Sequence, residues 1–208
     1  MAVFDEVSPA SVEQAAASFE GAGLVVCDGN LQPATLEQVL KQSAALSAPA
    51  WFEPVSVAKA QRGRCSLPWH LVSPNYDELM ALLGRASEAA ALPAQGWEAM
   101  VRKALDEAAS VGLAEHVLLT MGPLGAVLSC TSGGEAPLPA GGRDMVFDPA
   151  ALLRRVGGAP KGVPPLVVRA ERFQAVRGCH LWYRLRQPLA SVRDVTGAGD
   201  ALVAGAAR

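Results

Sequence analysis

Short apolar runs that end on polar residues alternate with helical patterns along the first 130 residues, and this alternation limits the fold more than any other feature. The run Leu24 to Asp28 is apolar up to its carboxylate, as in a strand buried on both faces. Similar runs end at Glu53, Val72 and Thr120, and the clearest helical spacing lies between Trp97 and Ala109. The pattern predicts an α/β fold with a mostly parallel sheet and a ligand crevice at the carboxyl ends of its strands.

Local signals place the remaining elements. Ser8 as N-cap and Pro9 at the first helical position open a helix that runs to Phe19. A Gly-rich turn followed by the apolar stretch Leu124 to Cys130 predicts an antiparallel hairpin. Residues 131–164 are rich in Gly and Pro and predict an irregular insertion. The further expected elements are a helix around Leu36 to Leu40, a short helix near Val57, an apolar group at Ala150 to Leu153, strands at 166–168 and 181–185, and a C-terminal helix.

Composition excludes several classes of protein. Half of the 208 residues are hydrophobic and 18% are charged, which is typical of a globular domain with a real core. The net charge is -2 and Lys and Arg form no basic stripe, which argues against a nucleic-acid partner. No apolar stretch is long enough to cross a bilayer, so we expect no membrane association and a cytoplasmic location. The four cysteines lie far apart, which favours reduced, buried thiols.

The strongest motif lies near the end of the chain and reads Asp194-Val195-Thr196-Gly197-Ala198-Gly199-Asp200. Its small residues precede an apolar helix, and backbone N–H groups at a helix N-terminus favour an anion. Asp200 carries the wrong charge for a phosphate ligand, so its useful role is to accept a proton from a substrate hydroxyl. A Gly-containing loop with an acidic first turn is also a common helix start, and the residues alone leave both interpretations open.

The same run closely resembles the D-T-G-A-G-D signature of the ribokinase-like (PfkB) kinases, with Val195 in place of the commoner Thr. The resemblance implies ATP and Mg²⁺ as cofactors and a small-molecule substrate. It also implies roles for six residues: an anion hole at Gly197, Ala198 and Gly199, a catalytic base at Asp200, and nucleotide contacts at Asp194 and Thr196.

Two weaker motifs occur in the order that this family shows. Asn75 and Glu78 resemble its N-x-x-E element, whose acid organises magnesium through the water shell of the ion. Thr120, Gly122 and Gly125 resemble its T-x-G-x-x-G turn, which lies against the nucleotide. Without the family context, the first motif is an ordinary helix N-cap and the second an ordinary hairpin turn.

Other candidate motifs fail on their context. Gly21 to Gly23 precedes a strand, whereas a Rossmann fingerprint follows one. Gly157 to Gly162 has its Lys before the last Gly, so it is not a Walker A loop. His70, His116 and His180 sit in or beside predicted strands, which favours packed or surface side chains over catalytic ones.

Three further strings, at 27–30, 51–60 and 73–75, resemble the pseudouridine kinase branch of the family. That branch implies phosphoryl transfer from ATP to the 5′-hydroxyl of pseudouridine, and ribose or fructose kinases are the alternative. Glu53 is then either a second magnesium-organising carboxylate or an edge carboxylate that faces water. The resemblance also leaves room for a homodimer in the full-length protein and for fusion to a pseudouridine-phosphate glycosidase.

The resemblance runs from about Leu24 to Ala206 and implies a three-layer α/β/α ribokinase-like fold that lacks the N-terminal part and the lid. Residues 1–208 are then expected to be a partial kinase domain, truncated within a predicted helix. A site left open to water loses positioning and electrostatic strength. A catalytically incompetent nucleotide-binding remnant is therefore the second hypothesis.

Overall fold

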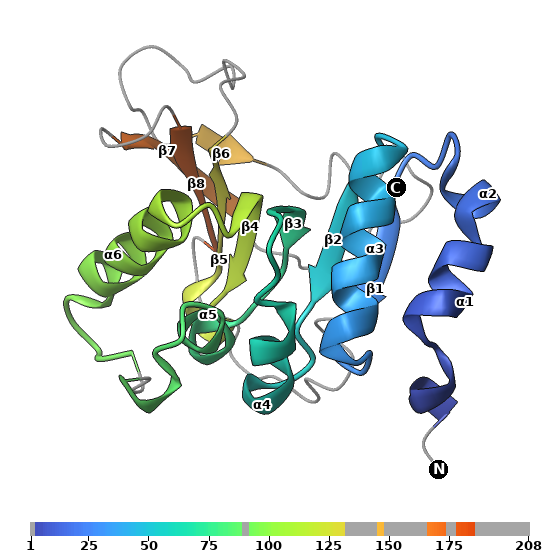
Figure 1. Cartoon of the computed structure of the whole chain (residues 1–208). Coiled ribbons are helices and arrows are strands. Elements are labelled where there is room, and N and C mark those ends of the chain that lie inside the picture. The colour runs from blue at the N-terminus through green and yellow to red at the C-terminus, as the bar shows by residue number, and fades with distance from the viewer. Residues whose placement is uncertain (1–2, 89–91, 132–144, 148–165, 174–177, 186–208) are drawn as a thin grey trace, which may run out of the picture.

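The computed structural model of the chain describes residues 3–88, 92–131, 145–147, 166–173 and 178–185. Its strands form one sheet in the order β1-β2-β3-β4-β5-β8-β7-β6 (Figure 1). Within these ranges, no helix combines the length and the apolar character needed to cross a membrane.

The first four strands are parallel neighbours in chain order. They are β1 (Val25–Asp28), β2 (Ala50–Glu53), β3 (Trp69–Val72) and β4 (Ala114–Thr120). The helices between them are α3 (Pro33–Ala45), α4 (Val57–Ala60), α5 (Tyr76–Leu82) and α6 (Trp97–Ser110). Right-handed crossovers that always advance in one direction put these helices on one face of the sheet (Figure 1). The third layer of an α/β/α fold is not among the described residues.

The second half of the sheet is antiparallel. It contains β5 (Ala126–Cys130), β8 (Gly178–Leu185), β7 (Leu166–Phe173) and β6 (Met145–Phe147). The α/β fold is confirmed, and the sheet is mixed, with three parallel and four antiparallel pairings among the described strands. The parallel part is smaller than the sequence predicts because no described helix separates β4 from β5 or β7 from β8.

The first helix is capped as expected but broken in the middle. Ser8 accepts a hydrogen bond from the Ser11 amide and Ser11 returns one from the Ser8 amide, which forms a capping box. The predicted single helix is wrong, since Ala15 has φ -84° and ψ 12° and divides it. The parts are α1 (Pro9–Gln14) and α2 (Ala16–Phe19), and short 3₁₀ turns occur at η1 (Val3–Glu6), η2 (Gln61–Gly63) and η3 (Ala86–Glu88).

Two boundaries in the second half also differ from the prediction. Residues Gly122–Leu124 form the 3₁₀ turn η4, so β5 begins at Ala126 and not at Leu124. The range 131–164, predicted to be irregular, contains β6. The predicted apolar group at Ala150 to Leu153 and the predicted C-terminal helix lie outside the described residues.

The main core lies between the sheet and the helices α3, α5 and α6. Phe52 and Trp69 stack with ring centroids 5.0 Å apart, and Trp97 meets Trp182 edge to face at 6.1 Å. Burial of each such side chain stabilises the fold by about 1.5–3 kcal/mol. A smaller cluster docks α1 and α2 on α3, and it contains Val12, Phe19, Val39 and Ala48.

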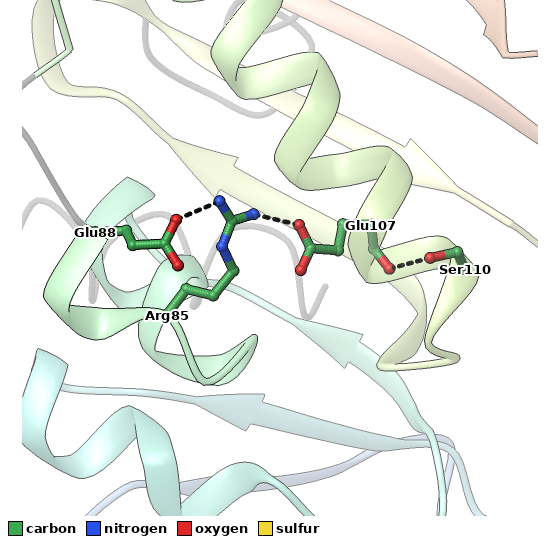
Figure 2. A network of polar contacts seen from close by, with 4 residues as sticks. All are labelled: Arg85, Glu88, Glu107 and Ser110. Atoms are coloured by element: carbon green, nitrogen blue, oxygen red, sulfur yellow. Dashed lines mark hydrogen bonds and ion pairs between the residues drawn. The ribbon is translucent and has the colours of Figure 1, made fainter.

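An ion-pair network joins the residues that follow α5 to helix α6. The Arg85 guanidinium donates to Glu88 at 2.6 Å and to Glu107 at 2.5 Å (Figure 2). The Ser110 hydroxyl donates to the Glu107 carbonyl at 2.8 Å. The network therefore links η3, which follows α5, to the last turn of α6.

Candidate functional site

Polar side chains gather where the parallel strands end. Asp28 ends β1, Glu53 ends β2, Ser73 follows β3 and Thr120 ends β4. Because these strands are parallel neighbours, their carboxyl ends share one edge of the sheet. In open α/β sheets, ligands bind outside this edge.

The backbone brings the two weaker motifs side by side at this edge. Asn75 and Thr120 form an isolated parallel bridge, and the Thr120 amide donates to the Pro74 carbonyl at 2.9 Å. The N-x-x-E and T-x-G-x-x-G motifs are far apart in the sequence. They are therefore neighbours in the fold.

Asn75 and Glu78 cap helix α5 with a reciprocal pair of hydrogen bonds. Asn75 Oδ1 accepts from the Glu78 amide, and Glu78 Oε2 accepts from the Asn75 amide, each at 2.9 Å. The helix N-cap interpretation is thus confirmed. Burial raises the pKa of the Glu78 carboxyl, and the charge of Asp77 raises it further. A carboxylate has about four lone-pair positions, so the capping bond leaves room for a hydrated cation, and the magnesium role of both residues stays a prediction.

Glu53 is held by hydrogen bonds that sequence reasoning missed. Trp51 Nε1 donates to Ser73 Oγ at 2.7 Å, and the Ser73 hydroxyl donates to Glu53 Oε2. Trp51 is fully buried and Glu53 half-buried, so the Glu53 residue is both hydrogen-bonded and partly exposed to water. The signal for Ser73 was its place directly after a strand, one position beyond Val72.

The loop after β1 is supported by two cations. The Asp28 carboxylate accepts from the Asn30 amide at 2.9 Å and from Asn30 Nδ2 at 2.7 Å. Lys59 Nζ donates to Asn30 Oδ1 at 2.6 Å, and Arg62 Nη1 donates to the Gly29 and Asn30 carbonyls at 3.1 Å. The α4–η2 segment therefore places positive charge near the carboxyl ends of the strands, where it attracts anions. No motif contains Arg62, and the string at 51–60 contains Lys59 but implies no role for it.

The Thr120 motif is a hairpin turn packed against β8. The Met121 amide donates to the Gly125 carbonyl at 2.9 Å and closes the turn. Gly125 has φ +101°, and a Cβ there would lie 2.1 Å from the Tyr183 carbonyl oxygen, so only glycine fits. Gly122 has φ +54° and open space around its Cβ position. The hairpin is confirmed, while nucleotide contacts at Thr120, Gly122 and Gly125 stay predictions.

The residues of the strongest motif lie outside the described ranges. They are Asp194, Thr196, Gly197, Ala198, Gly199 and Asp200. The structure therefore brings together the second and third motifs, and the roles of the first stay predictions from the sequence.

Comparisons with known proteins find a similarity of sequence and a similarity of fold. No protein-family model matches the chain. A pseudouridine kinase of Arabidopsis thaliana is 39% identical over 82 residues, which are 39% of this chain and 22% of that protein. A candidate sugar kinase of Clostridium perfringens superposes with a TM-score of 0.52 and 20% identity over 93% of this chain and 43% of that one. An Arabidopsis thaliana ribokinase, solved with ribose and ATP, gives a TM-score of 0.48 at 19% identity over 96% of this chain and 45% of that one.

The chain spans less than half the length of each of these proteins, since the shares covered are 22%, 43% and 45%. The Clostridium perfringens structure shows a shared fold. The Arabidopsis thaliana sequence match covers a shorter stretch but at higher identity.

Proposed function

We propose that this chain belongs to the ribokinase-like (PfkB) kinase family and contributes to a site for ATP-dependent phosphoryl transfer to the 5′-hydroxyl of pseudouridine or a related compound. The observation that carries the proposal is the bridge between Asn75 and Thr120, which sets two motifs of the family side by side at the carboxyl edge of the sheet. The 39% identity to a pseudouridine kinase favours a nucleoside over ribose or fructose.

The described residues fit the cofactors that the family implies. Mg-ATP supplies the phosphoryl group and a cation that offsets its charge. Glu53 and Glu78 offer the hard oxygen atoms that Mg²⁺ prefers. Each carboxylate already accepts one internal hydrogen bond, Glu53 from Ser73 and Glu78 from Asn75. We assign both to the water shell of the ion, which is the role that the resemblance to the N-x-x-E element implies for Glu78.

Two further features support anion binding at this edge. Lys59 is a cation 2.6 Å from Asn30 Oδ1 in the loop after β1, and it would draw phosphate toward the strand ends. The turn Thr120 to Gly125 would lie against the nucleotide, with its backbone fixed by β8.

The chemical step is assigned from the sequence. Asp200 would accept the proton of the substrate hydroxyl, so that this oxygen attacks the γ-phosphorus of ATP while the bond to the bridging oxygen breaks and ADP leaves. Backbone amides at Gly197, Ala198 and Gly199 stabilise the charge that develops on the phosphoryl oxygens. The support for these roles is the match of residues 194–200 to the family signature.

The test is transfer of phosphate from ATP to pseudouridine by the full gene product, with uridine, ribose and fructose assayed in parallel. We expect product with pseudouridine and a loss of at least about 100-fold in kcat for Asp200→Asn. Glu13→Gln changes an exposed carboxylate on α1 and serves as the control. If no nucleoside or sugar is phosphorylated, or if Asp200→Asn keeps full activity, the proposal fails.

A catalytically incompetent nucleotide-binding remnant stays the alternative hypothesis from the sequence. Calorimetry of Mg-ATP with the 208-residue chain separates the two, because a remnant binds the nucleotide without turnover. Measurable turnover by this chain excludes the remnant. A homodimer, a fused glycosidase and a cytoplasmic location stay predictions.

A further inference from the structure

A second cluster of polar side chains lies near the amino ends of β3 and β4, at the opposite ends of these strands from the candidate site. His70 Nδ1 lies 2.8 Å from Glu115 Oε2, and the His116 ring meets the His70 ring edge to face at 5.0 Å. One ligand atom from each of the three residues lies within 4.8 Å of the other two. No other group of three or more His, Cys, Asp or Glu side chains in the described part of the chain is arranged in this way.

An unpaired nitrogen provides independent evidence at this cluster. His116 Nδ1 is buried and has no hydrogen-bond partner among the described residues. Buried polar atoms are normally paired because an unpaired one has lost its hydration without compensation. An imidazole nitrogen that carries no proton has a lone pair with which it can bind a metal ion.

The backbone at the cluster is fixed while one ligand can turn. The Thr131 amide and hydroxyl both donate to the Glu115 carbonyl, at 2.8 Å and 2.9 Å. The side chain of Glu115 is 51% exposed, so it can rotate toward an ion without repacking the core.

We propose that His70, Glu115 and His116 bind one first-row transition-metal ion, and that Zn²⁺ fits them best. Two imidazole nitrogens and one carboxylate oxygen form a known three-ligand set for Zn²⁺, with bonds of about 2.0–2.2 Å. Atoms that share such an ion lie at most about 4.4 Å apart, so the present limit of 4.8 Å requires only a small side-chain rotation. Three protein ligands leave the fourth position to water.

The ion differs from the magnesium of the proposed kinase site in both place and chemistry. Mg²⁺ prefers oxygen atoms and binds imidazole poorly. The Zn²⁺ site would instead join β3 to β4 at the amino ends of these strands. Because the three ligands come together only in the folded chain, the bound ion raises the thermal stability of the protein.

Calorimetric titration of Zn²⁺ into the untagged chain, with excess Mg²⁺ present throughout, tests the proposal. We expect one Zn²⁺ ion per chain, and a loss of affinity of at least about tenfold in Glu115→Gln and in His116→Ala. The control is Glu13→Gln, which makes the same chemical change at an exposed position on α1 and should leave the affinity unchanged. Thermal unfolding should show a rise in Tm with Zn²⁺ in the wild type and a smaller one in Glu115→Gln.

Two results would overturn the metal site. One is a wild-type chain that binds no Zn²⁺ at micromolar concentrations. The other is equal Zn²⁺ affinity in the wild type and in the Glu115→Gln/His116→Ala double variant, with binding abolished by thiol alkylation, because four free cysteines offer other ligands. Circular dichroism without metal checks the fold of each variant. If His116→Ala does not fold, the result for the exposed Glu115 decides alone.

Discussion

Gly122 and Gly125 lie in the same turn between β4 and β5, with φ at 54° and 101°. The Cβ position of Gly122 is open, whereas at Gly125 it lies 2.1 Å from the Tyr183 carbonyl oxygen. We expect Gly122→Ala to lower the free energy of unfolding by about 1–2 kcal/mol, the cost of left-handed backbone. Gly125→Ala should cost more than about 3 kcal/mol, because β8 must also move. Urea denaturation measures both, and equal losses would contradict the close packing of this turn on β8.

At the residue scale, burial also raises the pKa values of two cysteine thiols. Burial raises the pKa of Cys65 to about 12 and that of Cys130 to about 11, with smaller effects from Glu37 and Cys179. A free cysteine has a pKa near 8.5, and only the thiolate is a good nucleophile. We therefore expect iodoacetamide to label both residues slowly at about pH 8 in the folded chain and at the ordinary rate in urea. Mass spectrometry measures the labelling, and rapid modification of the folded chain would contradict the raised pKa values.

At the scale of elements, two carboxyl groups on neighbouring elements have pKa values that shift in opposite directions. They are Glu78 on α5 and Glu88 on η3. Burial raises the pKa of Glu78, whereas the hydrogen bond from Arg85 lowers that of Glu88. Ionisation therefore opposes folding at Glu78 and favours folding at Glu88. The stability that Glu78 contributes is lost as the pH rises through its folded pKa. The stability that Glu88 contributes is lost as the pH falls through its folded pKa.

The two Glu→Gln variants should differ in the sign of their pH dependence. Glu78→Gln keeps an oxygen that can accept the capping bond, so it should match the wild type at about pH 4 and be more stable at about pH 7. Glu88→Gln should be less stable than the wild type at about pH 7, and this difference should become smaller as the pH falls. Urea denaturation at both pH values checks this. If both variants were more stable than the wild type at about pH 7, or both less stable, one of the two pKa shifts would be contradicted.

The starts of helices could be predicted from the sequence, whereas a break inside a helix could not. Ser8 and Asn75 are N-cap residues whose signals are local, and both caps form. Ala15 divides the first helix although alanine is the best helix former. Both pieces, α1 and α2, pack on α3. Tertiary packing therefore outweighs the local preference at this position.

In the candidate site, too, some features could be predicted from the sequence and others could not. The motifs that begin at Asn75 and Thr120 could be recognised because each is a continuous string of residues. The hydrogen bond from Ser73 to Glu53 depends on the register between β2 and β3, which pairs Phe52 with Val72. No spacing within the chain specifies that register, so the contact required the structure.

At the scale of the whole molecule, the sheet has a parallel half and an antiparallel half. The two halves differ in how well the sequence predicts them. The parallel half follows from strands that alternate with helices, and the sequence predicts it. The antiparallel half depends on β8, which pairs with β5 from across a long stretch of chain. Loop closure over such a distance leaves no local pattern in the sequence. The β4–β5 hairpin could therefore be predicted, whereas the places of β8, β7 and β6 in the sheet could not.

Arg184 on β8 links the antiparallel half of the sheet to helix α6. Its substitution tests whether the two halves of the sheet unfold separately. Its guanidinium lies 4.6 Å from the centroid of the Trp97 ring and donates to Glu98 Oε1 at 2.9 Å. Arg184→Gln removes both the cation–π contact and the ion pair, so we expect a loss of about 1–2 kcal/mol in the free energy of unfolding. Glu98→Gln removes only a surface ion pair and should cost less than about 1 kcal/mol.

Hydrogen exchange then locates the effect of Arg184→Gln. Amide protons of β8 and β7 should exchange faster than in the wild type, while those of β1, β2 and β3 keep their rates. The reason is that local opening of the antiparallel strands leaves the helix-covered parallel half folded. Glu98→Gln should leave exchange nearly unchanged in both halves. Equal acceleration in all strands of Arg184→Gln would show instead that the sheet opens as one cooperative unit, because each strand would then depend on the same contact.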